Sequence, residues 1–232
     1  MAQAYSPIQP TISAPLSLTD ESLRTAVETL AAFDSDLARV VAAFGCPPLW
    51  GRRPGFPTLL HIILEQQVSL ASAPAAFDRL AAAGPVTPEN LLRLNDTELR
   101  VIGFSRQKAG YARGLALALA SGELDLEALA EIEDRTAHRM LVGLKGIGPW
   151  TADIYLLMAL GRPDIWPVGD IALLQAMQEL KRLPQRPSNE MALTIAEGWR
   201  PWRAAAARIL WHWYLSTPRR RPATVGPLAL EP

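Results

Sequence analysis

Apolar side chains recur along this sequence mainly at the spacing of an α-helix, and this pattern constrains the fold more than any other feature. No stretch sustains the alternation of apolar and polar residues between turn signals that a half-buried strand requires. Helix start signals agree, with Thr87 before Pro88 and Ser188 before another helical segment. The sequence therefore predicts an all-α protein with about ten helices and almost no sheet.

The composition allows this fold to be stable without cross-links. Hydrophobic residues make up 49% of the 232 residues, enough for one large core or two small lobes. Cys46 is the only cysteine, so this chain alone builds neither an internal disulfide nor a thiolate-held cluster. The first twenty residues lack a basic start and an apolar run, and no later run is long enough to span a bilayer. We expect a cytoplasmic protein without membrane contact.

The charges balance, with 23 lysines and arginines against 23 aspartates and glutamates. This balance argues against a strongly basic protein that coats nucleic acid without sequence preference. Positive residues nevertheless cluster locally, for example around Arg106 and Lys108 and in the tail at residues 219–221. Either one basic face or ordinary solvated surface accounts for these clusters.

Two glycines, Gly146 and Gly148, lie in a turn between two predicted helices, with Pro149 suited to the first turn of the second helix. Glycines let the backbone approach a ligand closely, and the free N–H groups at a helix N-terminus can donate to an anionic oxygen. The turn is therefore a candidate phosphate-binding site. An ordinary corner between two helices explains the glycines alone equally well.

Four segments together resemble the helix-hairpin-helix (HhH-GPD) superfamily of DNA glycosylases, specifically the 3-methyladenine DNA glycosylase II branch. They are the hairpin at residues 144–152, Pro167-Val168-Gly169-Asp170, the segment 196–203 continuing to Leu210-Trp211, and residues 63–69. These segments run from about residue 56 to about residue 216 in the family's order. This resemblance is specific because several separate motifs carry it.

The resemblance implies a two-lobed all-α fold with the active-site cleft between the lobes. Residues 17–50 and 165–218 would form a lobe from both chain ends, and residues 51–164 a central lobe carrying the hairpin. Residues 1–16 and the basic tail at 219–232 read as loose segments. The short N-terminal stretch leaves no room for the sheet domain of larger family members, so we expect the compact form.

The resemblance also assigns Asp170 as the catalytic carboxylate of a monofunctional glycosylase that excises alkylated purines in base excision repair. A carboxylate in an apolar setting stabilises the oxocarbenium character of a sugar that is losing its base. Judged on position alone, Asp170 equally fits a plain helix cap. Trp150 occupies the place of the lysine nucleophile of strand-cleaving members, and Lys145 lies in the turn. We expect an abasic product, with no iron–sulfur cluster and no required cofactor.

The flipped base needs aromatic surfaces to receive it. By their motif positions, Trp150 and Trp211 are expected in the base pocket, where a cationic alkylated purine gains about 0.5–2 kcal/mol from an aromatic face. Ile154 stands at the family's aromatic position, with Tyr155 one place away, so the second stacking wall stays open. Gln67 is expected to plug the duplex, and Gln66 is the neighbour most easily confused with it.

Contacts to the DNA backbone are expected in and near the hairpin, from Gly146, Gly148, Lys145, Thr151, Arg106 and Lys108. The resemblance further implies that the carbonyls of Val142, Leu144 and Ile147 hold an optional monovalent cation, Na⁺ or K⁺. The expected partner is duplex DNA containing alkylated bases, bound by a monomer that is nucleoid-associated if the source is bacterial.

Two other functions remain open at this stage. An oxidised-base glycosylase that also cuts the strand would need an amine nucleophile near Asp170. A noncatalytic helix-hairpin-helix module that only binds DNA would need neither Asp170 nor the aromatic pair.

Overall fold

A computed structural model describes residues 17–66 and 72–217, and all regular structure in these ranges is helical. This confirms the predicted all-α class. The elements are α1 (Asp20–Phe33), α2 (Ser35–Phe44), α3 (Phe56–Glu65), α4 (Ser72–Ala83), α5 (Pro88–Arg93), α6 (Asp96–Ile102), α7 (Arg106–Ala120), η1 (Ala128–Ala130), α8 (Asp134–Val142), α9 (Pro149–Met158), α10 (Ile171–Leu180), α11 (Asn189–Glu197) and α12 (Arg203–Ser216).

Local sequence explains where several helices begin. Thr87 caps α5 by accepting a hydrogen bond from the Asn90 N–H, and Pro88 follows at the first helical position. Ser188 caps α11 in the same way through the Met191 N–H. Both predicted start signals are therefore confirmed, and each satisfies an N–H group that the helix itself leaves without a partner.

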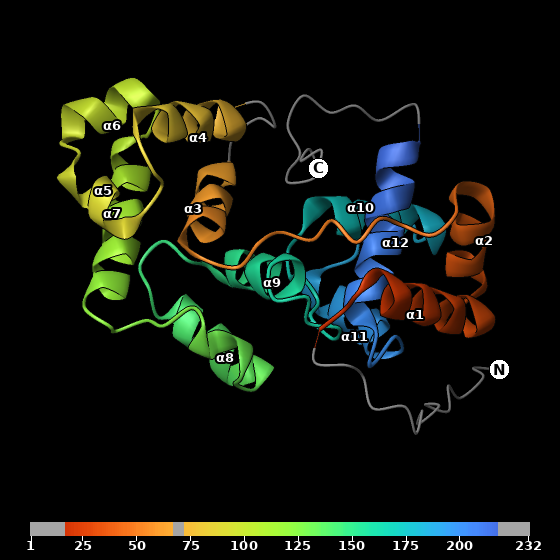
Figure 1. Cartoon of the computed structure of the whole chain (residues 1–232). Coiled ribbons are helices and arrows are strands. Elements are labelled where there is room, and N and C mark those ends of the chain that lie inside the picture. Colours follow the sequence, from red (N-terminus) through yellow and green to blue (C-terminus); the bar gives the residue numbers. More distant parts are fainter. Residues whose placement is uncertain (1–16, 67–71, 218–232) are drawn as a thin grey trace.

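The packed helix pairs fall into two groups. Helices α3 to α7 pack among themselves, while α1, α2, α10, α11 and α12 pack among themselves at the other end of the molecule (Figure 1). Helix α9 lies between the groups in this view and packs against α3 and α8. The second group draws its helices from both ends of the described chain, so its contacts join residues that lie far apart in the sequence.

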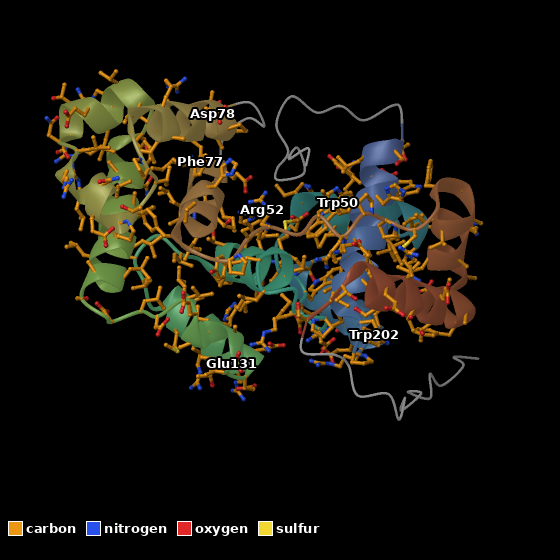
Figure 2. All side chains as sticks on the ribbon, in the orientation of Figure 1. Trp50, Arg52, Phe77, Asp78, Glu131 and Trp202 are labelled. Atoms are coloured by element: carbon orange, nitrogen blue, oxygen red, sulfur yellow. The ribbon has the colours of Figure 1, made fainter. Side chains whose placement is uncertain are left out.

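Buried arginines tie the groups together. Arg208 of α12 is fully buried, and its guanidinium donates to the carbonyls of Leu49, Leu157 of α9 and Ala204 at 2.8, 2.9 and 3.0 Å. Arg52 lies between the two groups (Figure 2), where its backbone N–H donates to the α9 carbonyl of Met158 and its guanidinium pairs with Glu65 of α3. These bonds fix α9 relative to α12.

No helix in the described ranges combines the length and the apolar character needed to cross a lipid bilayer.

Candidate active site

Asp170 lies at the start of α10, where its Oδ1 accepts a hydrogen bond from the Leu173 N–H at 2.9 Å. The chain reaches it through Gly169, which has φ +80°, a conformation that an L side chain rarely adopts. Asp170 is therefore a helix cap, as its position alone suggested. The cap leaves Oδ2 and one side of Oδ1 for other partners.

Two indoles take up those positions. Trp150 of α9 donates from Nε1 to Asp170 Oδ2 at 3.0 Å, and Trp211 of α12 donates from Nε1 to Oδ1 at 3.3 Å. Residues 20 and 41 positions away from Asp170 thus converge on one carboxylate. The structure brings together the predicted catalytic residue and the two tryptophans predicted for the base pocket. The tryptophans meet Asp170 through their indole N–H groups, whereas their predicted role uses the faces of the rings.

The residues that donate hydrogen bonds to the Asp170 carboxylate, Trp150, Leu173 and Trp211, all do so through neutral N–H groups. In the described part of the chain no lysine or arginine forms an ion pair with it. Burial raises the pKa of Asp170 above its ordinary value, although the Leu173 N–H and the two indoles each act to lower it. The result is a desolvated carboxylate whose anionic form is held only by dipoles.

Exposure separates the two tryptophans. Trp211 is 0% exposed, whereas Trp150 is partly exposed and Asp170 itself is 5% exposed. The faces of the Trp211 ring are packed in the core in this conformation. Only Trp150 therefore has surface left that a base can contact.

Ile154 and Tyr155 do not line a pocket, which corrects their predicted place. Both are 0% exposed, because α9 is buried on all sides from Thr151 to Met158. The Tyr155 hydroxyl accepts a hydrogen bond from the Gly55 N–H at 3.0 Å and so anchors the start of α3. These two residues belong to the core.

The hairpin between α8 and α9 is held from two sides. Gly146 has φ +97°, and a Cβ there would lie 2.1 Å from the ring of Tyr111 on α7, so only glycine fits. Gln66 donates from Nε2 to the Gly146 carbonyl at 2.8 Å and to Thr151 Oγ1 at 2.9 Å. The turn is fixed before any ligand binds, and Gly148 remains exposed at the N-terminus of α9.

These contacts decide which predicted DNA-contacting side chains are available. Thr151 is 2% exposed with its hydroxyl bonded to Gln66, so its side chain faces inward. Lys108 donates from Nζ to the Leu64 carbonyl at 2.5 Å, and burial lowers the pKa of this amine. Both side chains hold the protein together, contrary to their predicted role. Arg106 and Lys145 are exposed.

The two predicted plug residues have different outcomes. Gln66 is bonded to the hairpin, because its Nε2 group donates both to the Gly146 carbonyl and to Thr151 Oγ1. Gln67 lies outside the described residues.

One site residue was missed by sequence reasoning. Asp153 is 6% exposed on α9, one turn after Trp150, and its Oδ2 accepts a hydrogen bond from the Val168 N–H at 3.2 Å. The signal was present as a single acid within the apolar run of α9. Because charged groups are rarely buried without a partner, such an acid indicates a specific contact.

The carbonyls predicted to hold a cation lie at the end of α8 and in the turn. Leu144 O accepts a hydrogen bond from the Ile147 N–H at 3.1 Å, which leaves one lone pair for another partner. Val142 is the last residue of α8, where helix carbonyls lack intrahelical donors. The donor set thus fits a monovalent cation.

The sequence is similar to known DNA repair proteins. Residues 60–201 match the family model described as "HhH-GPD superfamily base excision DNA repair protein". A DNA-3-methyladenine glycosylase of Bacillus subtilis is 33% identical over 123 residues, which cover 53% of this chain and 41% of that protein. The chain spans about half the length of the curated relatives it matches first.

The fold is similar to solved structures of two DNA glycosylases. The Bacillus halodurans DNA-3-methyladenine glycosidase has a TM-score of 0.72 and 30% identity, covering 82% of this chain and 89% of that chain. The 3-methyladenine DNA glycosylase of Schizosaccharomyces pombe, solved with abasic DNA, has a TM-score of 0.70 and 28% identity, covering 81% of this chain and 95% of that chain.

Proposed function

Because the chain belongs to the HhH-GPD superfamily of base excision DNA repair proteins, we propose that it is a monofunctional glycosylase that excises alkylated purines from duplex DNA. The observation that carries this proposal is the Asp170 carboxylate, which is desolvated, accepts hydrogen bonds from three neutral N–H groups and forms no ion pair within residues 17–66 and 72–217. Such a group is suited to stabilise a positive charge that appears only during the reaction.

The proposed reaction breaks the bond between the sugar C1′ and the purine nitrogen. The bonding electron pair leaves with the purine, and an alkylated purine that entered as a cation departs neutral. Positive charge then develops at C1′ and the ring oxygen, beside Asp170. Water adds to C1′ and loses one proton to solvent, which leaves an abasic site. Since the described hydrogen-bond partners of Asp170 are two indoles and one backbone N–H, none of them can form a Schiff base, and we expect the strand to stay intact.

Access to Asp170 is proposed to open on the Trp150 side. Trp211 is fully buried behind the carboxylate, whereas Trp150 is partly exposed and stands at the start of α9, beside the exposed Gly148. A cationic base would meet the face of Trp150, an attraction of about 0.5–2 kcal/mol. The N–H groups of the hairpin would at the same time receive the neighbouring phosphate.

The remaining roles follow from the resemblance and the free groups. Gln67 would fill the gap left by the flipped nucleotide, and Arg106 and Lys145 would contact phosphates. The carbonyls of Val142, Leu144 and Ile147 would hold a monovalent cation, which when bound offsets repulsion between those carbonyls and the phosphate. The protein would act as a monomer on the duplex.

An assay on a duplex with a single 7-methylguanine or 3-methyladenine tests the proposal. The wild-type protein should release the free base and leave a strand that breaks only after alkali. Strand breakage without alkali, or a protein–DNA adduct after borohydride, would instead assign a strand-cleaving enzyme. Absence of base release from every alkylated duplex would leave only DNA binding and reject the enzymatic role.

A further inference from the structure

Asp153 is a buried acid that the proposed reaction does not use. Its side chain is 9% exposed, and it hydrogen-bonds neither lysine nor arginine in the described part of the chain. Burial raises its pKa to about 7, against opposing effects of the Val168 N–H and the charge of Arg203. An ionisable group in such a place destabilises the fold unless it holds something in position.

What Asp153 holds is the segment that carries Asp170. Its Oδ2 accepts the Val168 N–H at 3.2 Å, two residues before the catalytic carboxylate. From the same helix, Trp150 donates to Asp170 Oδ2 at 3.0 Å. Helix α9 therefore grips this segment at two points, on either side of Gly169, whose φ of +80° marks the turn.

The other oxygen of Asp153 faces α8. The Nε2 atom of His138 lies 3.3 Å from Asp153 Oδ1, and the His138 side chain is 29% exposed. Helices α8 and α9 are the two arms of the hairpin. The Asp153 carboxyl group thus connects both arms of the hairpin to the segment before Asp170, because it contacts His138 on α8 as well as the Val168 N–H. An acceptor that only met the Val168 N–H would leave α8 unconnected.

We propose that Asp153 is a positioning residue for base excision: it holds residues 168–170 against α9 and, through His138, couples the orientation of the Asp170 carboxylate to the hairpin that grips the DNA strand. This inference rests on the proposed function. It predicts that a change at Asp153 slows the chemical step while leaving DNA binding intact, because the hairpin N–H groups are unaffected.

Single-turnover excision of 7-methylguanine measures the effect. Asp153→Leu should lower the rate constant about 100-fold, as expected for a misplaced catalytic group, while affinity for a duplex with a tetrahydrofuran abasic analogue stays within about twofold. Asp153→Asn should recover most of the rate, because its amide oxygen still accepts the Val168 N–H. His138→Leu, at a partly exposed position, should give a loss of about tenfold and keeps the test usable if Asp153→Leu does not fold.

Asp34→Leu is the matched control, because Asp34 is a buried acid that caps α2, outside the segment before Asp170. It should lose stability without a change in rate per folded molecule. Wild-type rates in Asp153→Leu would overturn the inference. So would an Asp153→Asn variant as slow as Asp153→Leu, because the tether would then not be the cause.

A second readout needs no activity. The indole N–H resonances of Trp150 and Trp211 report their bonds to Asp170 in the DNA-free protein. Asp153→Leu should shift both, and Asp34→Leu neither. Unshifted indole resonances in Asp153→Leu would reject the positioning role, even if the wild-type protein excised bases. A wild-type protein that released no base would reject only the proposed function.

Discussion

Asp34 and Asp170 both cap helices at two places in the molecule, and they differ in whether a cation pairs with the carboxylate. Each is 5% exposed, each caps a helix, and each accepts an indole N–H, from Trp199 at 2.8 Å in the case of Asp34. Asp34 also has the Lys181 ammonium 2.7 and 2.9 Å from its two oxygens. Asp170 has a second indole in place of an ammonium.

This difference shifts the pKa values of the two carboxyl groups in opposite directions. Burial raises the pKa of Asp34, but Lys181, Trp199 and the Leu37 N–H outweigh it, so the pKa lies below the ordinary value. At Asp170 burial prevails and the pKa lies above it. A carboxylate that is already paired with a cation interacts weakly with a second cation. A carboxylate without such a partner can still stabilise a cationic sugar.

The largest expected effect is on excision. Asp170→Asn keeps the shape of the cap and removes the charge, so the single-turnover rate should fall by about 10³-fold or more, with affinity for abasic duplex retained. Asp34→Asn is the matched change and should leave the rate per folded molecule as in the wild type. Equal losses in the two variants would erase the distinction between the two sites.

A smaller effect is expected on stability. Lys181→Met leaves Asp34 buried without its cation, and the free energy of unfolding should fall by about 2–3 kcal/mol, less than for a fully buried pair because the Lys181 side chain is 22% exposed. Urea unfolding at pH 7 measures it. Excision per folded molecule should stay unchanged. A stability within about 0.5 kcal/mol of the wild type would show that Asp34 does not depend on Lys181.

Removing one indole donor tests the dipoles around each carboxylate. Trp150→Phe takes a hydrogen bond from the Asp170 anion, so its pKa should rise further and excision should slow by about tenfold, with the acid limb of the rate profile moved to higher pH. Trp199→Phe should instead cost about 1–2 kcal/mol of stability. A pH–rate profile of Trp150→Phe that overlays the wild type would contradict this role of the indole.

The smallest expected effects are on how stability depends on pH, where Asp170 and Asp34 should contribute to the free energy of unfolding with opposite signs. The folded pKa of Asp170 is raised, so its contribution to stability is present below the unfolded pKa of about 3.9 and is lost as pH rises through the folded pKa. The pKa of Asp34 is lowered, so its contribution is present above the unfolded pKa and is lost as pH falls through the folded pKa. Lowering the pH from 7 to about 3, below the unfolded pKa of an aspartate, should therefore favour the wild type over Asp170→Asn and lower its stability relative to Asp34→Asn. Urea unfolding of all three proteins at both pH values provides the measurement.

The helices and the capping position of Asp170 could be predicted from the sequence, because both depend on local signals, whereas the catalytic role of Asp170 stays a prediction. Capping residues such as Ser188 act within one turn, and Asp170 stands at a fixed spacing after the glycine turn. It also placed Trp150 and Trp211 at the site. Which atoms of these indoles meet the carboxylate depends on how α9 packs relative to α12, and no local pattern encodes that relation.

The predictions that were wrong share one cause. Ile154 and Tyr155 were assigned to a pocket by their positions in the family motif, but α9 is buried on every side at these residues, and a motif position does not specify that packing. The ammonium of Lys108 reaches Leu64, 44 residues away, so a side chain expected on DNA is instead bonded within the protein. Contacts of this range follow from tertiary packing.

If the Asp170 carboxylate stabilises a cationic sugar, the protein should prefer a duplex that carries a positively charged mimic of the transition state. Duplexes with a cationic pyrrolidine or a neutral tetrahydrofuran in place of the sugar differ mainly in charge at the reacting position. The wild type and Asp34→Asn should bind the cationic duplex at least about tenfold more tightly, and Asp170→Asn should lose this preference. Equal wild-type affinity for both duplexes, or a preference that survives in Asp170→Asn, would contradict the account.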